Sequence, residues 1–303
     1  MMEEAFIGIV LVNYNGVKDT IECIDSLKKM TYSNYRIIVV DNNSSDNSLK
    51  ILHEKKEEID FELLELNENK GFSAGNNAGI RLAFELGVKY ILLLNNDTLV
   101  EPDFLKKLMV AEKNILVNSV MTSTILYADN KEKIWYAGGS YDLKTSKVSQ
   151  WGMGKQWFPM RDKWVEVTFI SGCCMCIPVS IIPNIGFLDE DYFLYEEDTD
   201  YCIRIRQKGI KLYYVPNAVI YHKVSSSTSK AEKMSGTTQY YMVRNKYFLI
   251  KKYYKGRYRI IPYIHSFMMY SYYCLRYGME MKYIMWGIYD FWRGKMHKTN
   301  RKL

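Results

Sequence analysis

Four carboxylates lie within the six-residue segment 195–200 (YEEDTD), directly after the apolar residues 192–194. Crowded like charges raise one another's pKa and burial adds to that effect, so such a cluster favours a positioned base or the neighbour of a metal ion. The alternative is an acid-rich first turn of the helical pattern 201–206, where carboxylates complement the helix dipole. The segment alone leaves both interpretations open.

A second candidate for chemistry follows the apolar run 90–94, where Asn95, Asn96 and Asp97 stand in succession. A carboxylate at the end of a buried strand can hold Mg²⁺ or Mn²⁺ while the phosphates of a ligand complete the coordination shell. His222, directly after the run 219–221, is a candidate second ligand. A polar turn is the alternative for Asp97, and a structural role is the alternative for His222.

Two further polar motifs follow apolar runs. Asp41 ends the run 35–40 and could accept hydrogen bonds from a base or a ribose hydroxyl, although the following turn formers also make a good helix cap. The glycine-containing segment 69–79 joins a strand to a helix, and its backbone N–H groups could approach a phosphate there. It matches neither the Walker nor the Rossmann fingerprint.

These motifs are positioned by an alternation of strand and helix patterns. Apolar β-branched runs predict strands, and periodic runs predict helices between them. The predicted strands are 6–13, 35–40, 61–66 and 90–94, and the predicted helices are 20–30, 46–56 and 73–86. Such alternation predicts an α/β fold with a mostly parallel sheet, which binds ligands at the carboxyl ends of its strands.

The second half of the chain has a different pattern. Short alternating segments over 117–164 predict an inserted β-rich lobe, whose Trp residues could stack on sugar faces or simply fill a core. We further expect a core strand over 165–177, short strands at 211–215 and 218–221, and helices from 239 onward. The Ser-, Thr- and Lys-rich segment 224–238 is a candidate lid or a plain linker.

Composition is that of a globular protein, with 303 residues, 48% hydrophobic and 25% charged. The charge is uneven, because residues 244–303 hold 14 Lys and Arg against Glu280 and Asp290, and also 16 of the 44 aromatic residues. Basic residues among aromatics favour an anionic membrane surface or a nucleic acid. The uncharged run 260–275 is shorter than the ~18 residues of a spanning helix, so it could lie on a bilayer but not cross it.

Cysteines and the chain start indicate an intracellular protein. Of six cysteines only Cys173 and Cys176 have CxxC spacing, with no second pair to complete a zinc site, so reduced core thiols are expected. The acidic start 1–4 shows no secretory signal, and a cytoplasmic location is expected.

Taken in order, the motifs over residues 7–244 resemble the inverting glycosyltransferases of family 2, which have the GT-A fold, and especially their rhamnosyltransferase-like branch. The stretches that carry the resemblance are VNYN (12–15), VDNNSSD (40–46), GFSAGNNAG (71–79), LNNDT (94–98), SG (171–172), YEEDTDYCIR (195–204), VPNAVIYH (215–222) and RN (244–245). One departure is the metal motif, commonly Asp-x-Asp, which here is Asn95-Asn96-Asp97 and offers a carboxylate only at Asp97.

The resemblance implies a GT-A catalytic domain over 1–238, a Rossmann-like nucleotide-binding mixed sheet flanked by helices. Its nucleotide-sugar half would be 1–100, its acceptor half 101–238, and a basic aromatic helical region would follow over 239–303. Asp198 matches the catalytic base, and Asp97 and His222 match ligands for Mg²⁺ or Mn²⁺. The expected donor-binding residues are Val12, Asn13, Asn15, Asp41, Asn43, Gly71, Asn76, Asn77, Asn96 and Asp97, and the expected acceptor-binding residues are Gly172, Glu197 and Trp151.

The predicted reaction is a metal-dependent, inverting transfer from a nucleoside-diphosphate sugar, dTDP-rhamnose or a UDP-hexose, to a glycan or polyprenyl-linked acceptor of a bacterial surface polysaccharide. UDP-N-acetylhexosamine or UDP-galactose is the rival donor. A non-catalytic nucleotide-binding scaffold is the second hypothesis, against which the Glu197-Asp198 pair speaks. The basic tail suggests a nucleic-acid-binding protein as the third, but no nucleic-acid partner is expected. A peripheral position at the inner face of the membrane and an oligomeric state remain open.

Overall fold

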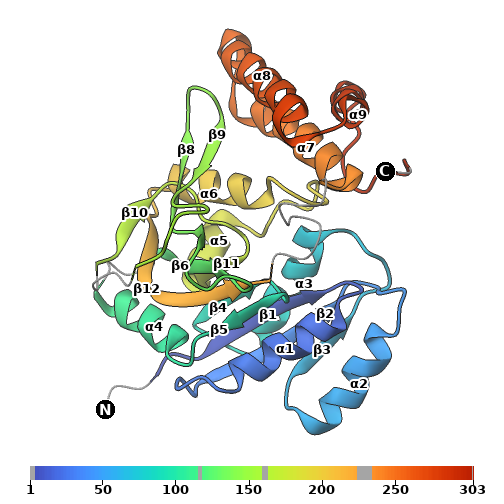
Figure 1. The fold of residues 1–303 in the computed structure, drawn as a ribbon. Helices are drawn as coiled ribbons and strands as arrows, with labels where there is room; N and C mark the ends of the chain where they lie inside the picture. Colours follow the sequence, from blue (N-terminus) through green and yellow to red (C-terminus); the bar gives the residue numbers. More distant parts are fainter. Residues whose placement is uncertain (1–3, 115–117, 159–162, 224–233, 302) are drawn as a thin grey trace.

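The computed structural model describes residues 4–114, 118–158, 163–223, 234–301 and 303. Its centre is a ten-stranded mixed sheet flanked by helices (Figure 1). Eight strands follow one another across it, in the order β10 (Val165–Val167), β12 (Leu212–His222), β6 (Val120–Tyr127), β11 (Cys174–Pro178), β4 (Tyr90–Leu94), β1 (Ile7–Asn13), β2 (Tyr35–Asp41) and β3 (Glu62–Glu65). The α/β fold with a mixed sheet flanked by helices, predicted from the sequence, is confirmed.

The first half is the predicted parallel sheet. Strand β1 pairs in parallel with β2 and β4, and β2 pairs in parallel with β3. The helices between them are α1 (Val17–Leu27), α2 (Ser48–Glu58) and α3 (Phe72–Glu85). Helix α3 lies close on β1, because a Cβ atom at Gly79 would come within 2.4 Å of the Val10 side chain. This glycine therefore serves helix–strand packing.

The second half corrects three predictions. The predicted strand 165–177 is two strands, because the chain leaves the sheet edge after β10 and turns at Gly172 before β11 enters the centre, antiparallel to β4 and β6. The predicted strands 211–215 and 218–221 are the single strand β12, with a register shift between Val215 and Val219 around Pro216, which lacks an N–H group. The lobe predicted over 117–164 is smaller, since β6 belongs to the main sheet.

The remaining elements complete this half. Strand β5 (Thr98–Val100) pairs with β12, β7 (Ile134–Tyr136) pairs with β6, and β8 (Gly139–Asp142) with β9 (Lys147–Gln150) forms a separate ribbon. The helices are α4 (Phe104–Asn114), the short η1 (Val179–Ile181) and α5 (Ile182–Ile185), and α6 (Glu197–Gln207). The acidic segment thus supplies the first turn of α6. The candidate lid lies outside the described residues over 224–233.

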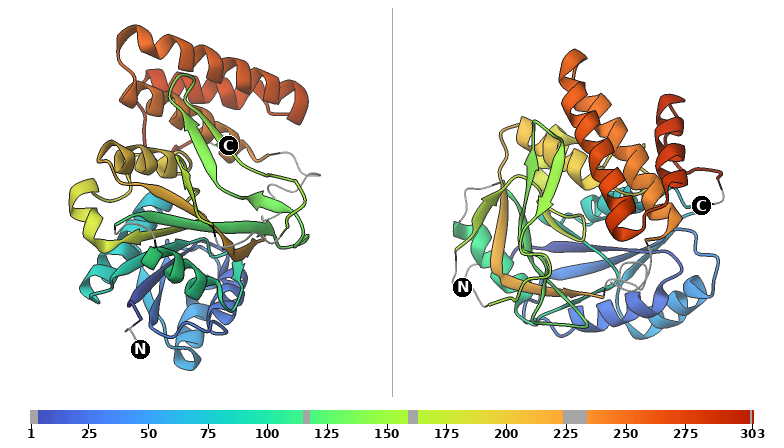
Figure 2. Two further views of the ribbon diagram at one scale, coloured as in Figure 1. Left: turned by 90° about the vertical axis from the view of Figure 1, so that its left-hand side faces the viewer. Right: turned by 45° about the horizontal axis from the view of Figure 1, so that its top comes forward.

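The C-terminal region is helical, as predicted, and the views of Figure 2 show its helices stacked at one end of the molecule. It comprises α7 (Gly236–Tyr253), the short η2 (Gly256–Arg259), α8 (Ile260–Tyr277) and α9 (Met281–Trp292). Within the described ranges, no helix combines the length and apolarity needed to cross a membrane. All six cysteines are free, five of them are buried, and Cys274 on α8 is half-buried.

Candidate functional site

A buried polar network joins the carboxyl ends of three parallel strands. Asn13 donates to Asp41 Oδ1 at 2.7 Å and accepts from the Thr20 hydroxyl at 2.8 Å, and Asn96 donates to that hydroxyl at 2.8 Å. Ser44 donates its hydroxyl and its N–H to the two Asp41 oxygens, at 2.6 and 2.9 Å. Asn13 and Asp41 thus fix the ends of β1 and β2 against each other, and their side chains are inside the protein.

The turns after β1 and β2 are held to each other as well. Asn15 accepts from the Ser45 N–H at 2.8 Å and donates its own N–H to the Ser44 hydroxyl at 3.0 Å. Asn15 and Asn43 have left-handed backbones, with φ of 53° and 59°, a conformation that asparagine tolerates. Both residues are exposed.

The loop before α3 is closed by asparagines and a glycine. Asn69 accepts from the Gly71 N–H at 2.9 Å, and Asn42 donates to the Gly71 carbonyl at 3.1 Å. Gly71 has φ of 99°, and a Cβ atom there would lie 2.1 Å from the Phe193 carbonyl oxygen. Only glycine fits this crossing, which brings the loop against the segment before the acidic turn.

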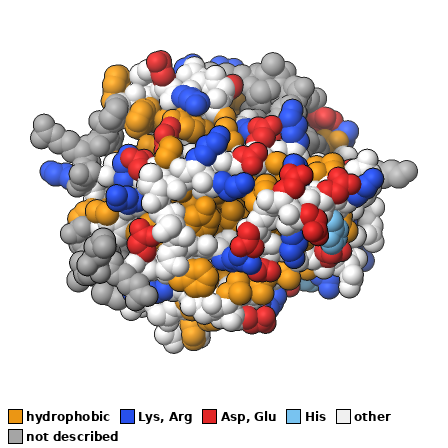
Figure 3. Space-filling model, turned by 90° about the horizontal axis from the view of Figure 1, so that it is seen from below, with side chains coloured by type: hydrophobic (Ala, Val, Ile, Leu, Met, Phe, Trp, Pro, Cys, Tyr) orange, Lys and Arg blue, Asp and Glu red, His pale blue; other side chains and the backbone are white. Residues whose placement is uncertain are grey.

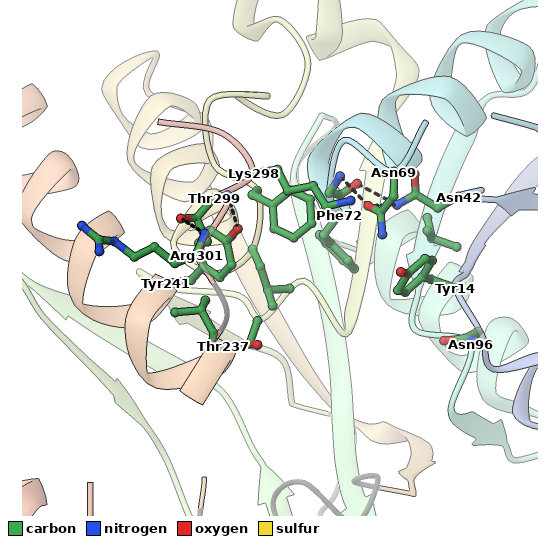
Figure 4. Close-up of a pocket in the computed structure, with 15 residues that line it drawn as sticks. Tyr14, Asn42, Asn69, Phe72, Asn96, Thr237, Tyr241, Lys298, Thr299 and Arg301 are labelled. Atoms are coloured by element: carbon green, nitrogen blue, oxygen red, sulfur yellow. Dashed lines mark hydrogen bonds between the residues drawn. The ribbon is translucent and has the colours of Figure 1, made fainter. Parts of the chain in front are cut away.

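A cavity of about 520 Å³ lies between these turns and the C-terminal region. Figure 4 shows Tyr14, Asn42 and Asn69 on one side and Thr237, Tyr241 and Thr299 on the other. The cavity is lined by Val12, Tyr14, Asn42, Asn69, Gly71, Phe72, Asn96, Phe193, Leu194, Thr237, Tyr241, Lys298, Thr299, Arg301 and Leu303. The chain after α9 therefore supplies part of its wall.

The predicted metal ligands come together. Asp97 Oδ1 lies 3.1 Å from His222 Nε2, with the two side chains 17% and 10% exposed, and Trp135 packs edge-on against the imidazole with ring centroids 4.5 Å apart. Burial raises the pKa of Asp97, but the His222 contact and the Lys223 charge outweigh it and hold that pKa below its usual value. Within the described residues, no third His, Cys, Asp or Glu joins the pair.

This pair fits a divalent cation that a ligand helps to hold. His222 Nδ1 is buried with no hydrogen-bond partner in the described part of the chain, and Asp97 Oδ1 is buried with the His222 Nε2 contact at 3.1 Å. Oxygen and imidazole nitrogen are suitable ligands for Mn²⁺, and oxygen suits Mg²⁺, while phosphate oxygens and water would complete the shell. The donor set supports the predicted cation without requiring further protein ligands.

Asp198 lies in the first turn of α6, beside the turn that leads into β11. Its carboxylate accepts from the Gly172 N–H at 3.0 Å and from the Thr199 N–H at 2.7 Å. A Cβ atom at Gly172 would lie 3.3 Å from the cavity residue Phe72 and 3.6 Å from Asp198 Cβ. Burial, opposed by these N–H groups and aided by the Glu196 charge, raises the pKa of Asp198 to about 6.

Glu197 is buried next to Asp198, with Oε2 left without a hydrogen-bond partner among the described residues. Burial, and then the Asp198 charge, raise the pKa of Glu197 well above its usual range. The residues before it, Tyr195 and Glu196, both have left-handed backbones, with φ of 69° and 72°. Consecutive left-handed residues other than glycine are strained and need surrounding support.

Helix α7 supplies that support. Asn245 donates to the carbonyl oxygens of Leu194 and Tyr195 at 2.8 and 3.0 Å. Lys246, only 5% exposed, pairs with Glu196 at 2.9 Å. Lys252 also pairs with the fully buried Asp200. The C-terminal region thus holds the acidic turn in place, a role that its sequence pattern did not indicate.

Among the predicted site residues, all of which the structure describes, Val12, Gly71 and Asn96 line this cavity and the others do not. Three of the others make contacts elsewhere. Asn76 donates to the Phe72 carbonyl within α3, and Asn77 exchanges hydrogen bonds with Leu188 and donates to Glu190. Trp151 follows β9, is 37% exposed and packs over Gly138. The cavity residues that were not predicted to bind include Tyr14 and Phe72, which lie inside recognised motifs, and Tyr241, which lies outside them.

The fold and these strand ends define a glycosyltransferase of the GT-A type, and sequence comparison agrees. The glycosyl transferase family 2 model matches residues 8–186, more than half of the chain, so the chain belongs to that family. It is 26% identical over 250 residues to the dTDP-rhamnosyl transferase RfbF of Shigella flexneri, covering 80% of this chain and 79% of the relative. It is 27% identical over 207 residues to the low-salt glycan biosynthesis hexosyltransferase Agl10 of Haloferax volcanii, covering 68% and 63%.

Two solved structures share the fold. The mannosyltransferase PcManGT from Pyrobaculum calidifontis, in complex with GDP-Man and Mn²⁺, matches with a TM-score of 0.58 and 13% identity over 95% of this chain and 74% of that chain. GalNAc-T7, with UDP, GalNAc and Mn²⁺, matches with a TM-score of 0.62 and 16% identity over 90% of this chain and 57% of that chain. At these identities the likeness concerns the fold alone.

Proposed function

We propose that the protein transfers a sugar, with inversion, from a nucleoside-diphosphate sugar to a hydroxyl of a glycan or polyprenyl-linked glycan. The observation that carries this proposal is Asp198, a carboxylate whose pKa is raised to about 6 and which is hydrogen-bonded to Gly172, a glycine that lies against the cavity residue Phe72. Similarity to a dTDP-rhamnosyl transferase and a hexosyltransferase supports dTDP-rhamnose or a UDP-hexose as the donor. UDP-N-acetylhexosamine and UDP-galactose are the rival donors.

The donor would lie in the cavity across the ends of β1, β2 and β4. Val12, Gly71 and Asn96 line it, whereas Asn13 and Asp41 would act by holding the strand ends in register. Lys298 lies at the same cavity and offers a cation for phosphate oxygens. Asp97 and His222 would hold Mg²⁺ or Mn²⁺, which when bound neutralises charge on the departing diphosphate.

Asp198 would accept the proton of the acceptor hydroxyl. As that hydroxyl oxygen bonds to the anomeric carbon from the face opposite the diphosphate, the bond from that carbon to the diphosphate oxygen breaks. Glu197, which keeps its proton to higher pH, would donate a hydrogen bond to the acceptor. Gly172 N–H and Thr199 N–H would hold the Asp198 carboxylate in position.

The test is nucleotide release from a panel of dTDP- and UDP-sugars, with Mn²⁺ or Mg²⁺ and a lipid-linked acceptor extract. We expect release from one donor class, dependent on metal, and a loss of about 10²- to 10⁴-fold in Asp198→Asn with nucleotide binding retained. Glu166→Gln, at an exposed carboxylate paired with Lys211, is the matched control. Release equal to wild type in Asp198→Asn would remove Asp198 from the base role.

A non-catalytic scaffold is the competing function. It would bind nucleotide sugar without turning it over in any donor and acceptor combination. The raised pKa of Asp198 counts against it, because a carboxylate held only for structure is normally stabilised in its charged form.

A further inference from the structure

Helix α8 leaves one apolar face uncovered. Its exposed side chains recur every three or four residues, which places them on one side of the helix. They are Ile260, Ile261, Ile264, Phe267, Met268, Tyr272 and Leu275, the last 89% exposed, whereas the exposed Tyr277 at the end of the helix lies on the other side. Pro262, Ser266 and Tyr270 are buried on the other side, where the Tyr270 hydroxyl donates to the Met242 carbonyl of α7.

Helix α9 continues this exposure with Met281, Met285, Tyr289 and Trp292. Of the 20 exposed large hydrophobic side chains in the described structure, 13 lie between Tyr258 and Trp292. Such a concentration on one element pair marks an interaction surface, since scattered single hydrophobic residues would need no explanation. We call these exposed residues of α8 and α9 the apolar face.

The charges beside the apolar face are almost all positive. Residues 255–295 contain seven Lys and Arg against Glu280 and Asp290, and Asp290 is buried and bonded to Arg301. Arg257 and Arg276 flank α8 at its two ends. Figure 3 shows the molecule from the opposite side, where acidic and basic side chains are interspersed.

We propose that the apolar face docks on the surface of an anionic lipid bilayer. Its aliphatic side chains would enter the boundary between headgroups and acyl chains, Tyr289 and Trp292 would lie at the interface, and the arginines would meet lipid phosphates. A second copy of the chain is a poorer occupant, because a two-fold contact would set one basic surface against another. This inference rests on the proposed function and deepens it, since a lipid-linked acceptor would be anchored in the same bilayer.

The experiment is co-sedimentation of the full chain with vesicles of phosphatidylcholine alone or with 30% phosphatidylglycerol, a proportion of roughly the order that gives an anionic surface. We expect binding to the anionic vesicles, weakened by salt, and a blue shift of tryptophan emission. Phe267→Glu with Leu275→Glu should weaken that binding by about tenfold or more. Val110→Glu, at a 54% exposed residue of α4, is the control.

Unaltered vesicle binding in the double variant would overturn the proposal. The proposal would also be overturned if the wild type sedimented as a dimer, the double variant sedimented as a monomer, and neither bound vesicles. A second copy of the chain would then cover the apolar face. Nucleotide release with a delipidated glycan acceptor should remain at the wild-type rate in the double variant and would show that the chain is folded. If vesicles bind but no donor is turned over, the docking surface stands and the proposed function fails.

Discussion

Asn245 of α7 holds the backbone of Tyr195 by donating a hydrogen bond to its carbonyl oxygen at 3.0 Å. Tyr195 is the first of two left-handed residues, and α6 with Asp198 begins immediately after them. A strained turn persists when contacts with the surrounding structure stabilise it by more than the strained backbone conformation costs. The position of the proposed base therefore depends on a residue that is about 50 positions away in the sequence.

Asn245→Ala should lower kcat by about 10- to 100-fold while the donor KM changes little, because a small displacement of a catalytic group is costly. The acid limb of the pH profile should also move, since the Gly172 N–H contact to Asp198 depends on the turn. Asn34→Ala, which removes a similar bond to the Glu4 carbonyl, is the control for lost stability alone. An unchanged kcat and pH profile would argue against positioning by Asn245.

The pH dependence should follow Asp198. As a base it must be ionised, and its pKa is raised to about 6, so kcat/KM should fall about tenfold per pH unit below that value and level off above it. Steady-state rates between pH 4.5 and 8 would test this, and the limb should vanish from the residual rate of Asp198→Asn. A limb that persists in the variant would belong to another group.

The contribution of Asp198 to the free energy of unfolding should fall with rising pH over the range in which kcat/KM rises. The folded protein keeps the Asp198 proton to higher pH than the unfolded chain, so this residue destabilises the fold increasingly as pH rises from about 4 to about 6. Asp198→Asn should therefore raise the free energy of unfolding at pH 7 by about 1 to 2 kcal/mol and leave it nearly unchanged at pH 4. Urea unfolding at the two pH values measures the difference, and equal stability gains at both would contradict it.

Metal dependence should reside in Asp97 and His222. Asp97→Asn and His222→Gln should each raise the Mn²⁺ concentration for half-maximal activity by about tenfold or more, because each would remove one of the two proposed protein ligands. Calorimetric titration of Mn²⁺ in the presence of nucleoside diphosphate provides a second readout. Asp103→Asn, at a half-exposed carboxylate paired with Lys107, should behave as wild type.

Gly71 and Gly87 form a matched pair of glycines. Both have positive φ, of 99° and 74°, but a Cβ atom at Gly71 would collide with the Phe193 carbonyl, whereas one at Gly87 would meet nothing within 4 Å. Gly87→Ala should cost about 1 kcal/mol from backbone strain, and Gly71→Ala should cost about 3 kcal/mol or more and disturb the cavity. Thermal unfolding with a nucleotide-binding assay would compare them, and equal losses would show that the crossing tolerates a side chain.

The sequence predicted the parallel half of the fold closely, because period-two and period-3.6 patterns are local properties. Strand β4 has the predicted bounds, while α1 begins three residues earlier than expected. The second half was predicted less well, since β11 inserts between β4 and β6 from a distant part of the chain. No local pattern distinguishes that path from one continuous strand over 165–177.

The candidate site likewise contains residues that local sequence patterns predicted and residues that they did not. Asp97 and His222 stand at the ends of strands that could be recognised individually, and the structure brings them to 3.1 Å. Asn77 was predicted to bind the donor, but its side-chain amide instead donates hydrogen bonds to the Leu188 carbonyl and the Glu190 carboxylate. The hydrogen bonds from Asn245 to the Leu194 and Tyr195 carbonyl oxygens could not be predicted, because they depend on where α7 lies in space.

Two ion pairs join α7 to the acidic segment: Lys252 with the fully buried Asp200, and Lys246 with Glu196. They limit which helical regions can be combined with this catalytic half during evolution. In a chimera that joins this catalytic half to the helices of another relative, Glu196 would lose its counter-charge and Asp200 would keep only Arg204, its partner within α6, unless the incoming helix carried lysines at matching positions. Such modules should be exchanged during evolution only as a set. The helical region and the acidic turn would then share one line of descent even where the intervening surface diverges.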